Sequence, residues 1–184
     1  RSRVDSLKIE QGEALGFYTK MNGSFLDTIG TTSQLCSLAS VSSEIEAYTS
    51  FLKGKEHAGI ERAVLGGAFA RNAMDIDQYR KFVELVSVQA TFEQEFKVRA
   101  SEGALAFFGN LMQDASVQEV QRYRDRVYQV AITGAFDEDP KAWFSAATQR
   151  INLLKQVSDY MAENLANHAA DARAAALNRR TLLA

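Results

Sequence analysis

The residues best able to do chemistry in this sequence form the stretch Lys55-Glu56-His57-Ala58-Gly59-Ile60-Glu61-Arg62-Ala63. If this stretch belongs to one helix from Glu44 to Phe69, one row of positions repeats every three and four residues. The row comprises Ile45, Tyr48, Leu52, Lys55, Gly59, Arg62, Gly66 and Phe69. Two cations and two glycines therefore lie where a bundle helix normally carries Leu or Ile.

Both residue types are unfavourable at buried helix positions. A buried cation needs a counter-charge, and a glycine in a helix interior costs about 1 kcal/mol. One interpretation is that the glycines form a shallow notch and that the cations, above all Arg62, face an anion between the helices. The alternative is that the two cations lay their methylenes on the apolar seam and extend their charge into water, or pair with Glu56 or Glu61 on the helix surface. The spacing leaves both interpretations open.

Residue patterns for catalysis and metal binding are absent from the sequence. It contains no His-Glu-x-x-His, no Glu-x-x-His and no cysteine pair. His57 and His168 have no carboxylates at ligand spacing, so we expect both on the solvated surface. Cys36 is the single cysteine, and without a neighbouring base it is not expected to act as a nucleophile. We therefore expect no enzyme activity, no cofactor and no metal.

The length and composition are those of one ordinary globular domain, with 184 residues, 46% hydrophobic and 24% charged. The formal net charge is −2 with the two signs interspersed, which gives no electrostatic footprint for nucleic acid. No run approaches the roughly 18 apolar residues needed to span a membrane. Because the sequence opens on Arg1 rather than Met, we expect a piece of a longer protein from which flanking transmembrane helices have been removed.

A single proline and many Ala, Leu, Glu and Gln residues predict an all-α fold. We expect one domain over residues 1–184, an elongated up-and-down bundle of four to five long helices. The first helix runs from Val4 to about Leu35, and a serine-rich turn over 37–43 follows, in which Ser42 or Ser43 caps the second helix. The heptad row of the first helix comprises Val4, Leu7, Ala14, Tyr18, Met21, Phe25 and Leu35, with Gln11, Thr28 and Thr32 at the remaining places.

The second helix ends at Asn72-Ala73-Met74, and Asp75 with Gln78 predicts the cap of the third. The apolar stripe of the third helix is Phe82, Leu85, Phe92 and Phe96, in which Gln89 holds a core-like place, more typical of a satisfied core amide than of a ligand contact. This helix can continue past Gly103 to Leu111.

Ser116 and Glu119 form a capping box that predicts a fourth helix ending near Gly134. Its inward residues are Val117, Val120, Val127 and Ala131. Asp139 and Pro140 begin the last helix, which exceeds about 50 Å in length. Its inward row comprises Phe144, Ala147, Ile151, Leu154, Met161 and Leu165.

The pattern Lys55-Glu56-x-x-Gly59-x-Glu61-Arg62-Ala63, preceded by Ala47-Tyr48-x-x-Phe51-Leu52, resembles the signature of the NIT domain, the nitrate- and nitrite-sensing module of bacterial receptors and regulators. Further fragments are similar to the version found in methyl-accepting chemotaxis receptors: Arg1-x-x-Val4-Asp5, Phe17-Tyr18-Thr19-x-x-Asn22 and Trp143-Phe144-x-x-Ala147-Thr148-x-x-Ile151-x-x-Leu154-Lys155. The resemblance implies a sensor module that binds nitrate or nitrite between helices and passes a helix shift to an output domain. It also implies a homodimeric periplasmic domain of an inner-membrane receptor, although the family also occurs fused to cytoplasmic RNA-binding domains.

The resemblance assigns roles to the residues of the central stretch. Nitrate is planar, singly charged and weakly hydrated, and a guanidinium matches it with two parallel N–H donors. Arg62 is therefore the expected nitrate-binding residue. Lys55, two turns away on the same face, either shapes the field or pairs with a facing carboxylate, and Gly59 gives room for the ion. Glu56 and Glu61 hold the cations in place, and Gln89 is a further supporting residue.

The sequence departs from the family pattern at one point. The NIT pattern includes an earlier helix with a Glu-Arg-Gly-x-Ser stretch, whose arginine faces the later one across the ligand. No such stretch occurs here, and Arg1 and Arg3 are the only arginines before Arg62. Either half of the site lies outside this sequence, or this member binds differently or not at all. The competing interpretation is a structural bundle that dimerises or spaces other domains and binds no small molecule.

Overall fold

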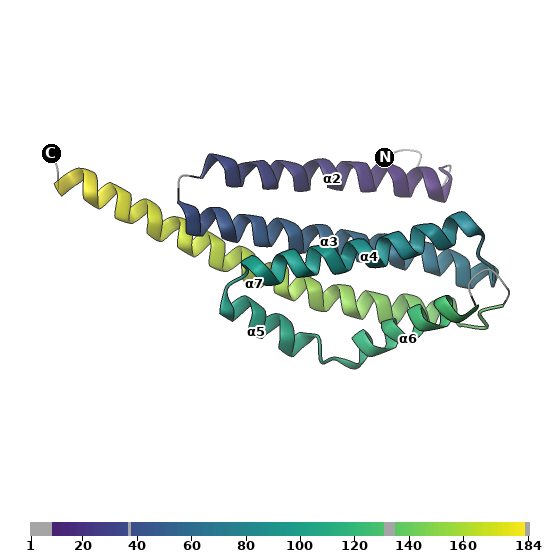
Figure 1. Ribbon diagram of the computed structural model, residues 1–184. Helices are drawn as coiled ribbons and strands as arrows, with labels where there is room; N and C mark the ends of the chain where they lie inside the picture. The colour runs from purple at the N-terminus through teal and green to yellow at the C-terminus, as the bar shows by residue number, and fades with distance from the viewer. Residues whose placement is uncertain (1–8, 37, 131–134, 183–184) are drawn as a thin grey trace.

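Helix α3, Ala39–Arg71, is the central element of the structure. The computed structural model describes residues 9–36, 38–130 and 135–182. Helix α3 packs against α2 (Gln11–Leu35), α4 (Ile76–Arg99) and α7 (Pro140–Leu182), while α5 (Glu102–Leu111) and α6 (Ala115–Val130) lie against α7. Successive long helices run in opposite directions (Figure 1), so the predicted all-α, elongated bundle is confirmed. In the described ranges no helix has both the length and the hydropathy that a membrane crossing requires.

The core consists of two clusters of apolar side chains, one behind the other along the bundle. The first gathers around Leu65, Phe69, Phe82, Tyr123 and Trp143. The second gathers around Phe51, Ala58, Phe96, Phe108 and Leu154. Between the two clusters, α3, α4 and α7 each carry one polar side chain, Glu61, Gln89 and Arg150, beside buried apolar residues such as Ile60 and Leu85, and these polar side chains belong to the candidate site described below.

Three predicted helix boundaries are confirmed, and each has a local chemical cause. Asp75 and Gln78 form the reciprocal capping box that begins α4. The backbone N–H of Lys141 donates to the Asp139 carboxylate at 2.9 Å, and Pro140 is the first residue of α7. Helix α3 ends at Asn72, which adopts the left-handed conformation common at helix ends.

Three other boundaries differ from the prediction. The third predicted helix breaks at Ala100, because the Ser101 side chain accepts from the backbone N–H of Ala104 and caps a separate helix, α5. Asp114, rather than Ser116, accepts at the start of α6, and it bonds both the backbone N–H and the hydroxyl of Ser116. Helix α3 already begins at Ala39, so Ser42 and Ser43 lie inside it. Predictions about Val4, Leu7, Ala131 and Gly134 lie outside the described residues.

The predicted buried row of α3 is displaced by one residue from the observed one. The observed row comprises Ala47, Phe51, Ala58, Glu61, Leu65 and Ala68, while the ends of the predicted row, Ile45 and Phe69, are buried as predicted. The central members of the predicted row, Tyr48, Leu52, Lys55, Gly59, Arg62 and Gly66, are each half-buried. Because α3 contacts helices on three sides, its periodicity does not single out one inner face. The charge that the core encloses on α3 is therefore the carboxylate of Glu61.

The inward faces of α2 and α7 also differ from the prediction. On α7, Trp143 is buried and Phe144 is exposed. On α2, the predicted heptad row faces solvent, and Tyr18, Met21, Phe25 and Leu35 are exposed large side chains of this row. Helix α2 packs on α3 through another face, on which Ser33 is buried.

The rotation of α7 can be tested with one pair of substitutions. Trp143 is 1% exposed, packs on the rings of Phe69 and Tyr123, and donates its indole N–H to the Arg62 carbonyl at 3.0 Å. Trp143→Ala should lower the free energy of unfolding by about 3–5 kcal/mol, because it leaves a cavity. Phe144 is 52% exposed, so Phe144→Ala should cost no more than about 1 kcal/mol. Urea unfolding followed by circular dichroism measures both, and equal losses would contradict the observed rotation.

Candidate functional site

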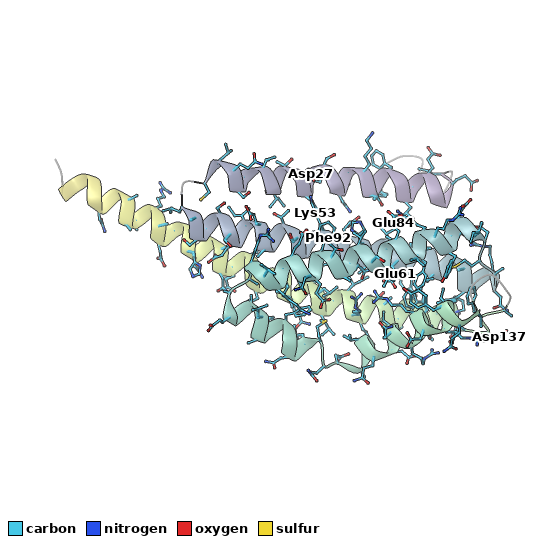
Figure 2. All side chains as sticks on the ribbon, in the orientation of Figure 1. Asp27, Lys53, Glu61, Glu84, Phe92 and Asp137 are labelled. Carbon is cyan, nitrogen blue, oxygen red and sulfur yellow. The ribbon has the colours of Figure 1, made fainter. Side chains whose placement is uncertain are left out.

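Four helices each contribute one polar side chain to a single layer between the two apolar clusters. These side chains are Glu61 of α3, Gln89 of α4, Arg124 of α6 and Arg150 of α7. Glu61 lies inside the bundle, enclosed by the surrounding helices (Figure 2). We call this set the polar layer.

The centre of the polar layer is the Glu61 carboxylate, which is 1% exposed. Arg124 donates from Nε to one carboxylate oxygen and from Nη2 to the other, both at 2.7 Å. Gln89 Nε2 donates to the second oxygen at 2.8 Å. Burial by itself raises the pKa of Glu61, but the hydrogen bonds and charge of Arg124, together with Gln89, hold it below the usual value. The carboxylate is therefore ionised and fully engaged.

Among the described residues, Arg150 forms no ion pair with a carboxylate, although the charges of Glu61 and Glu93 act on it. The Gln89 Oε1 atom accepts from Arg124 Nη2 at 3.0 Å and from Arg150 Nη1 at 3.1 Å. Within the described ranges, this is the hydrogen bond that the Arg150 side chain makes, although a guanidinium offers several more donors. Burial, and then the charge of Arg124, lower the pKa of Arg150 to about 10. Two guanidinium groups and one carboxylate leave the layer with a formal charge of +1.

A small cavity of about 20 Å³ lies beside the polar layer. Its polar walls are Lys55, Gln89, Glu93 and Arg150. Its other walls come from α3, α5 and α7. Lys55 Nζ donates to Ser158 Oγ at 2.9 Å, and burial lowers the pKa of Lys55 despite the opposing effect of Asp159. Two cations, Lys55 and Arg150, and one carboxylate, Glu93, therefore border a space with room for about one water-sized guest.

An open cleft of about 800 Å³ leads from the surface toward this cavity. Residues of α4, α5, α6 and α7 line the cleft. The cleft and the cavity share Glu93, Phe108 and Arg150 as walls. Arg124 and Arg150 of the polar layer both line the cleft, and Arg150 lines the cavity as well.

Arg62, the expected nitrate-binding residue, lies outside the polar layer on the α3–α7 surface. It is half-buried, donates from Nη1 to Thr148 Oγ1 at 2.9 Å, and lies 4.6 Å from the centre of the Phe144 ring. Beside it runs a shallow groove of about 490 Å³, bordered by Gly66, Gly67 and Lys141. Arg62 thus has a groove next to it but does not reach the cavity that Lys55 lines.

The other expected site residues are distributed over three places. Lys55 and Gln89 meet at the cavity. Gly59 faces open space, since a Cβ added there meets no atom within 4 Å. Glu56 accepts from Asn22 Nδ2 of α2 at 3.1 Å to each oxygen, and Glu61 holds Arg124. The hydrogen bonds of both carboxylates therefore go to residues other than Lys55 and Arg62, although the charge of Glu56 acts on Lys55.

Sequence reasoning missed Arg124 and Arg150, although a signal for both was present. On α7 the buried residues Trp143, Ala147, Leu154, Val157 and Met161 follow alternating steps of four and three that pass through position 150. On α6, Arg124 lies beside the buried row of Val120, Tyr123 and Val127. A search for charged residues on buried rows would have found both once the inner faces were known.

The two histidines and the cysteine lie away from the polar layer. His57 is half-buried and bonds the Lys53 carbonyl through Nδ1 at 2.7 Å, which corrects the expectation of a solvated ring. His168 is exposed, as predicted, and its Nδ1 lies 2.8 Å from the Glu44 carboxylate. In the part of the chain that the structure describes, no group of three His, Cys, Asp or Glu side chains is placed to hold a metal ion.

The polar layer makes a prediction about stability and its pH dependence. Glu61→Gln leaves Arg124 buried without a counter-charge and should cost about 3–5 kcal/mol at neutral pH. Because the folded-state pKa of Glu61 is depressed, its contribution is present above the unfolded pKa of about 4.3 and is lost as the pH falls through the folded value. Denaturant unfolding at several pH values measures the difference between the two proteins.

The matched control is Glu84→Gln, which removes an exposed carboxylate that pairs with Lys81 on the surface of α4. It should cost less than about 1 kcal/mol. A Glu61→Gln cost as small as that of the control, or one that stays constant down to acidic pH, would contradict the assigned role.

Comparison with known proteins identifies the family of this chain. The model of the nitrate and nitrite sensing family, NIT, matches residues 1–166. A nitrate regulatory protein of Klebsiella oxytoca is 27% identical over 173 residues, which cover 94% of this chain and 43% of that protein, so the chain spans less than half of its length. No solved structure matches the chain significantly. Because the family model covers most of the sequence, the resemblance seen in the Lys55–Ala63 block is confirmed, and the chain belongs to the NIT family of nitrate and nitrite sensing domains.

Proposed function

We propose that this chain is the ligand-binding module of a bacterial signal-transduction receptor, and that it binds nitrate or nitrite in the cavity beside the polar layer. The observation that carries the proposal is the positive charge of Arg150, which no carboxylate among the described residues pairs with, next to Lys55. Arg150 and Lys55 are both half-buried, and a cation that is partly withdrawn from water is stabilised when an anion meets it. A bound anion would supply the missing charge.

The cavity suits a small oxyanion with delocalised charge. The Arg150 guanidinium offers planar paired donors, Lys55 offers a point charge, and the apolar walls suit a weakly hydrated ion. The carboxylates have supporting roles, since Glu61 fixes Arg124 and Glu56 ties α3 to α2. The hydrogen-bond donors of Arg150 and Lys55 suit the binding of an anion rather than catalysis, so the proposed role is sensing.

Arg62 is a second candidate for the anion contact, with Gly59 one turn before it on the same helix. The observation that favours it is the groove bordered by Arg62, Lys141 and two glycines. Its guanidinium is already engaged by Thr148 and Phe144. The two locations are far enough apart along α3 that single substitutions separate them.

The small size of the cavity links anion binding to movement of the helices around it. The cavity admits about one water-sized guest, whereas nitrate has several heavy atoms, so binding requires the helices around the cavity to move apart. Shifts of about 1–2 Å between packed helices are a known means of signal transfer. Such a shift follows only if the ion binds the opened packing better than the closed one.

The proposed setting is a homodimeric, membrane-anchored receptor of the chemotaxis type, with this domain in the periplasm. The name of the Klebsiella relative, a nitrate regulatory protein, is also compatible with a cytoplasmic regulator. The residues that precede Arg1 in the full-length protein decide between the two. An apolar span of about 18 residues or more there supports the receptor.

Isothermal titration with nitrate, nitrite and chloride tests the function and the site. We expect saturable heat with nitrate or nitrite. Arg150→Lys should weaken binding at least about tenfold, because an ammonium cannot form the paired contact. Lys55→Met should also weaken it, while Arg62→Ala should leave the affinity unchanged. Circular dichroism checks that each variant is folded.

The reverse pattern, with Arg62→Ala weakening binding and Arg150→Lys not, would move the site to the groove. Heat only from a chain extended before Arg1 would place part of the site upstream, where the family's Glu-Arg-Gly arginine is expected. No heat from either chain would contradict the sensor proposal and favour the structural bundle.

A further inference from the structure

A carboxylate borders the cavity in which we place the anion. Of the described residues that line this cavity, Glu93 of α4 alone carries a negative charge. It follows Gln89 by one helical turn and lines the open cleft as well. Its side chain is 40% exposed, so it is in contact with both spaces and with water. A negative charge repels an entering anion, and its presence at this position therefore calls for an explanation.

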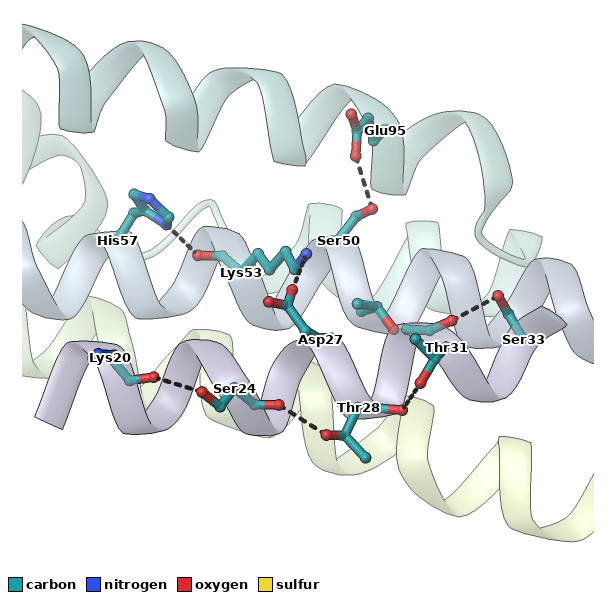
Figure 3. A network of polar contacts seen from close by, with 12 residues as sticks. Lys20, Ser24, Asp27, Thr28, Thr31, Ser33, Ser50, Lys53, His57 and Glu95 are labelled. Carbon is teal, nitrogen blue, oxygen red and sulfur yellow. Dashed lines mark hydrogen bonds and ion pairs between the residues drawn. The ribbon is translucent and has the colours of Figure 1, made fainter. Parts of the chain in front are cut away.

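The three glutamates of α4 differ in what they contact. Glu84 pairs with Lys81 on the surface of the helix. Glu95 is turned toward α3, where it accepts from Ser50 Oγ at 2.9 Å (Figure 3). Neither of these two lines the cavity or the open cleft. Glu93 is thus the glutamate of α4 that an anion meets on its way into the cavity.

Lys97 holds the Glu93 carboxylate from outside the cavity. Its Nζ donates to Glu93 Oε1 at 2.6 Å and lies 5.6 Å from the centre of the Phe108 ring. Phe108 lines both spaces, whereas Lys97 lines the cleft but not the cavity. Because the pair is partly exposed, water screens it. Lys97 therefore offsets the charge of Glu93 only in part, and that charge still acts on Arg150.

The charges of the cavity walls sum to a single positive charge. Lys55 and Arg150 each contribute one positive charge and Glu93 one negative charge, which gives a formal net charge of +1. The attraction between the walls and an anion grows in proportion to the charge of the anion. The cost of taking the anion out of water grows with the square of its charge. Walls of low net charge therefore disfavour a doubly charged anion more than a singly charged one.

We propose that Glu93 makes the anion cavity selective for singly charged oxyanions, and that Lys97 tunes this selection by offsetting part of the charge of the carboxylate. The inference rests on the proposed function, because it assigns the specificity of the same site. Glu93 lowers the affinity for every anion, but its repulsion of a doubly charged anion such as sulfate is twice its repulsion of nitrate. A repulsive group of this kind lowers affinity and raises specificity.

Isothermal titration with nitrate and with sulfate, at constant low ionic strength, tests the selection. Glu93→Gln should raise the nitrate affinity at least about threefold and the sulfate affinity at least about tenfold, because the second factor is the square of the first. Lys97→Met should have the opposite effect and lower both affinities, because it leaves the charge of Glu93 without its partner. The double variant should bind nitrate more tightly than Lys97→Met alone.

The matched control is Glu84→Gln, which makes the same change of charge on the same helix but outside the cavity and the cleft. It should leave both affinities unchanged. Circular dichroism verifies that each variant is folded. A damaged fold cannot account for the expected result, since Glu93→Gln is expected to gain affinity rather than to lose it.

The outcomes separate this inference from the proposed function. Wild-type affinities in Glu93→Gln, or equal gains for nitrate and sulfate, would overturn the charge selection and leave the nitrate site standing. Sulfate heat from Glu93→Gln but not from wild type, with no nitrate heat from any of the proteins, would support the charge selection and contradict nitrate sensing. The absence of heat with both anions from every protein would overturn both proposals.

Discussion

The bidentate pair between Glu61 and Arg124 is the constraint on which the rest of the bundle depends. A carboxylate that is 1% exposed tolerates no misplacement, because losing its partner leaves a bare charge in the core. Its bonds to Arg124 and Gln89 connect α3, α6 and α4 at one level and so fix how far each helix can slide. The apolar clusters on either side keep the pair buried, and this burial is what makes the loss of either partner costly.

The same pair determines where charge remains. Once Arg124 has taken both oxygens of Glu61, Arg150 can reach only the Gln89 amide oxygen, which it shares with Arg124. One network thus contains two guanidinium groups in different states, one paired with a carboxylate and one bonded only to a neutral amide. The neutralised one, Arg124, bonds side chains of α3 and α4, and the other, Arg150, lines both the open cleft and the cavity together with Glu93.

The positions of the helices could be predicted from the sequence better than the residues by which each helix faces the core. Helix ends with their own chemistry, at Asp75 and Pro140, follow from neighbouring residues alone and were correct. The inner face of α3 was placed one residue off because three helices surround it, and no single stripe distinguishes it. The same limit explains the candidate site. Lys55 and Gln89 were identified, while Arg124 and Arg150 depended on the rotation of α6 and α7, which only the packing of Tyr123 and Trp143 decides.

Helix α2 extends the consequence of this packing to the outer surface. Its side toward α3 carries the polar contacts of Asn22 and Asp27, and the adjoining side carries the aromatic heptad row. Polar contacts between α2 and α3 depend on direction and distance, so they transmit a small displacement that a purely apolar contact would absorb by sliding. Glu56 and Lys53 flank the turn of α3 that also carries Lys55. Asn22 and Asp27 thus connect α2 to the part of α3 that borders the cavity.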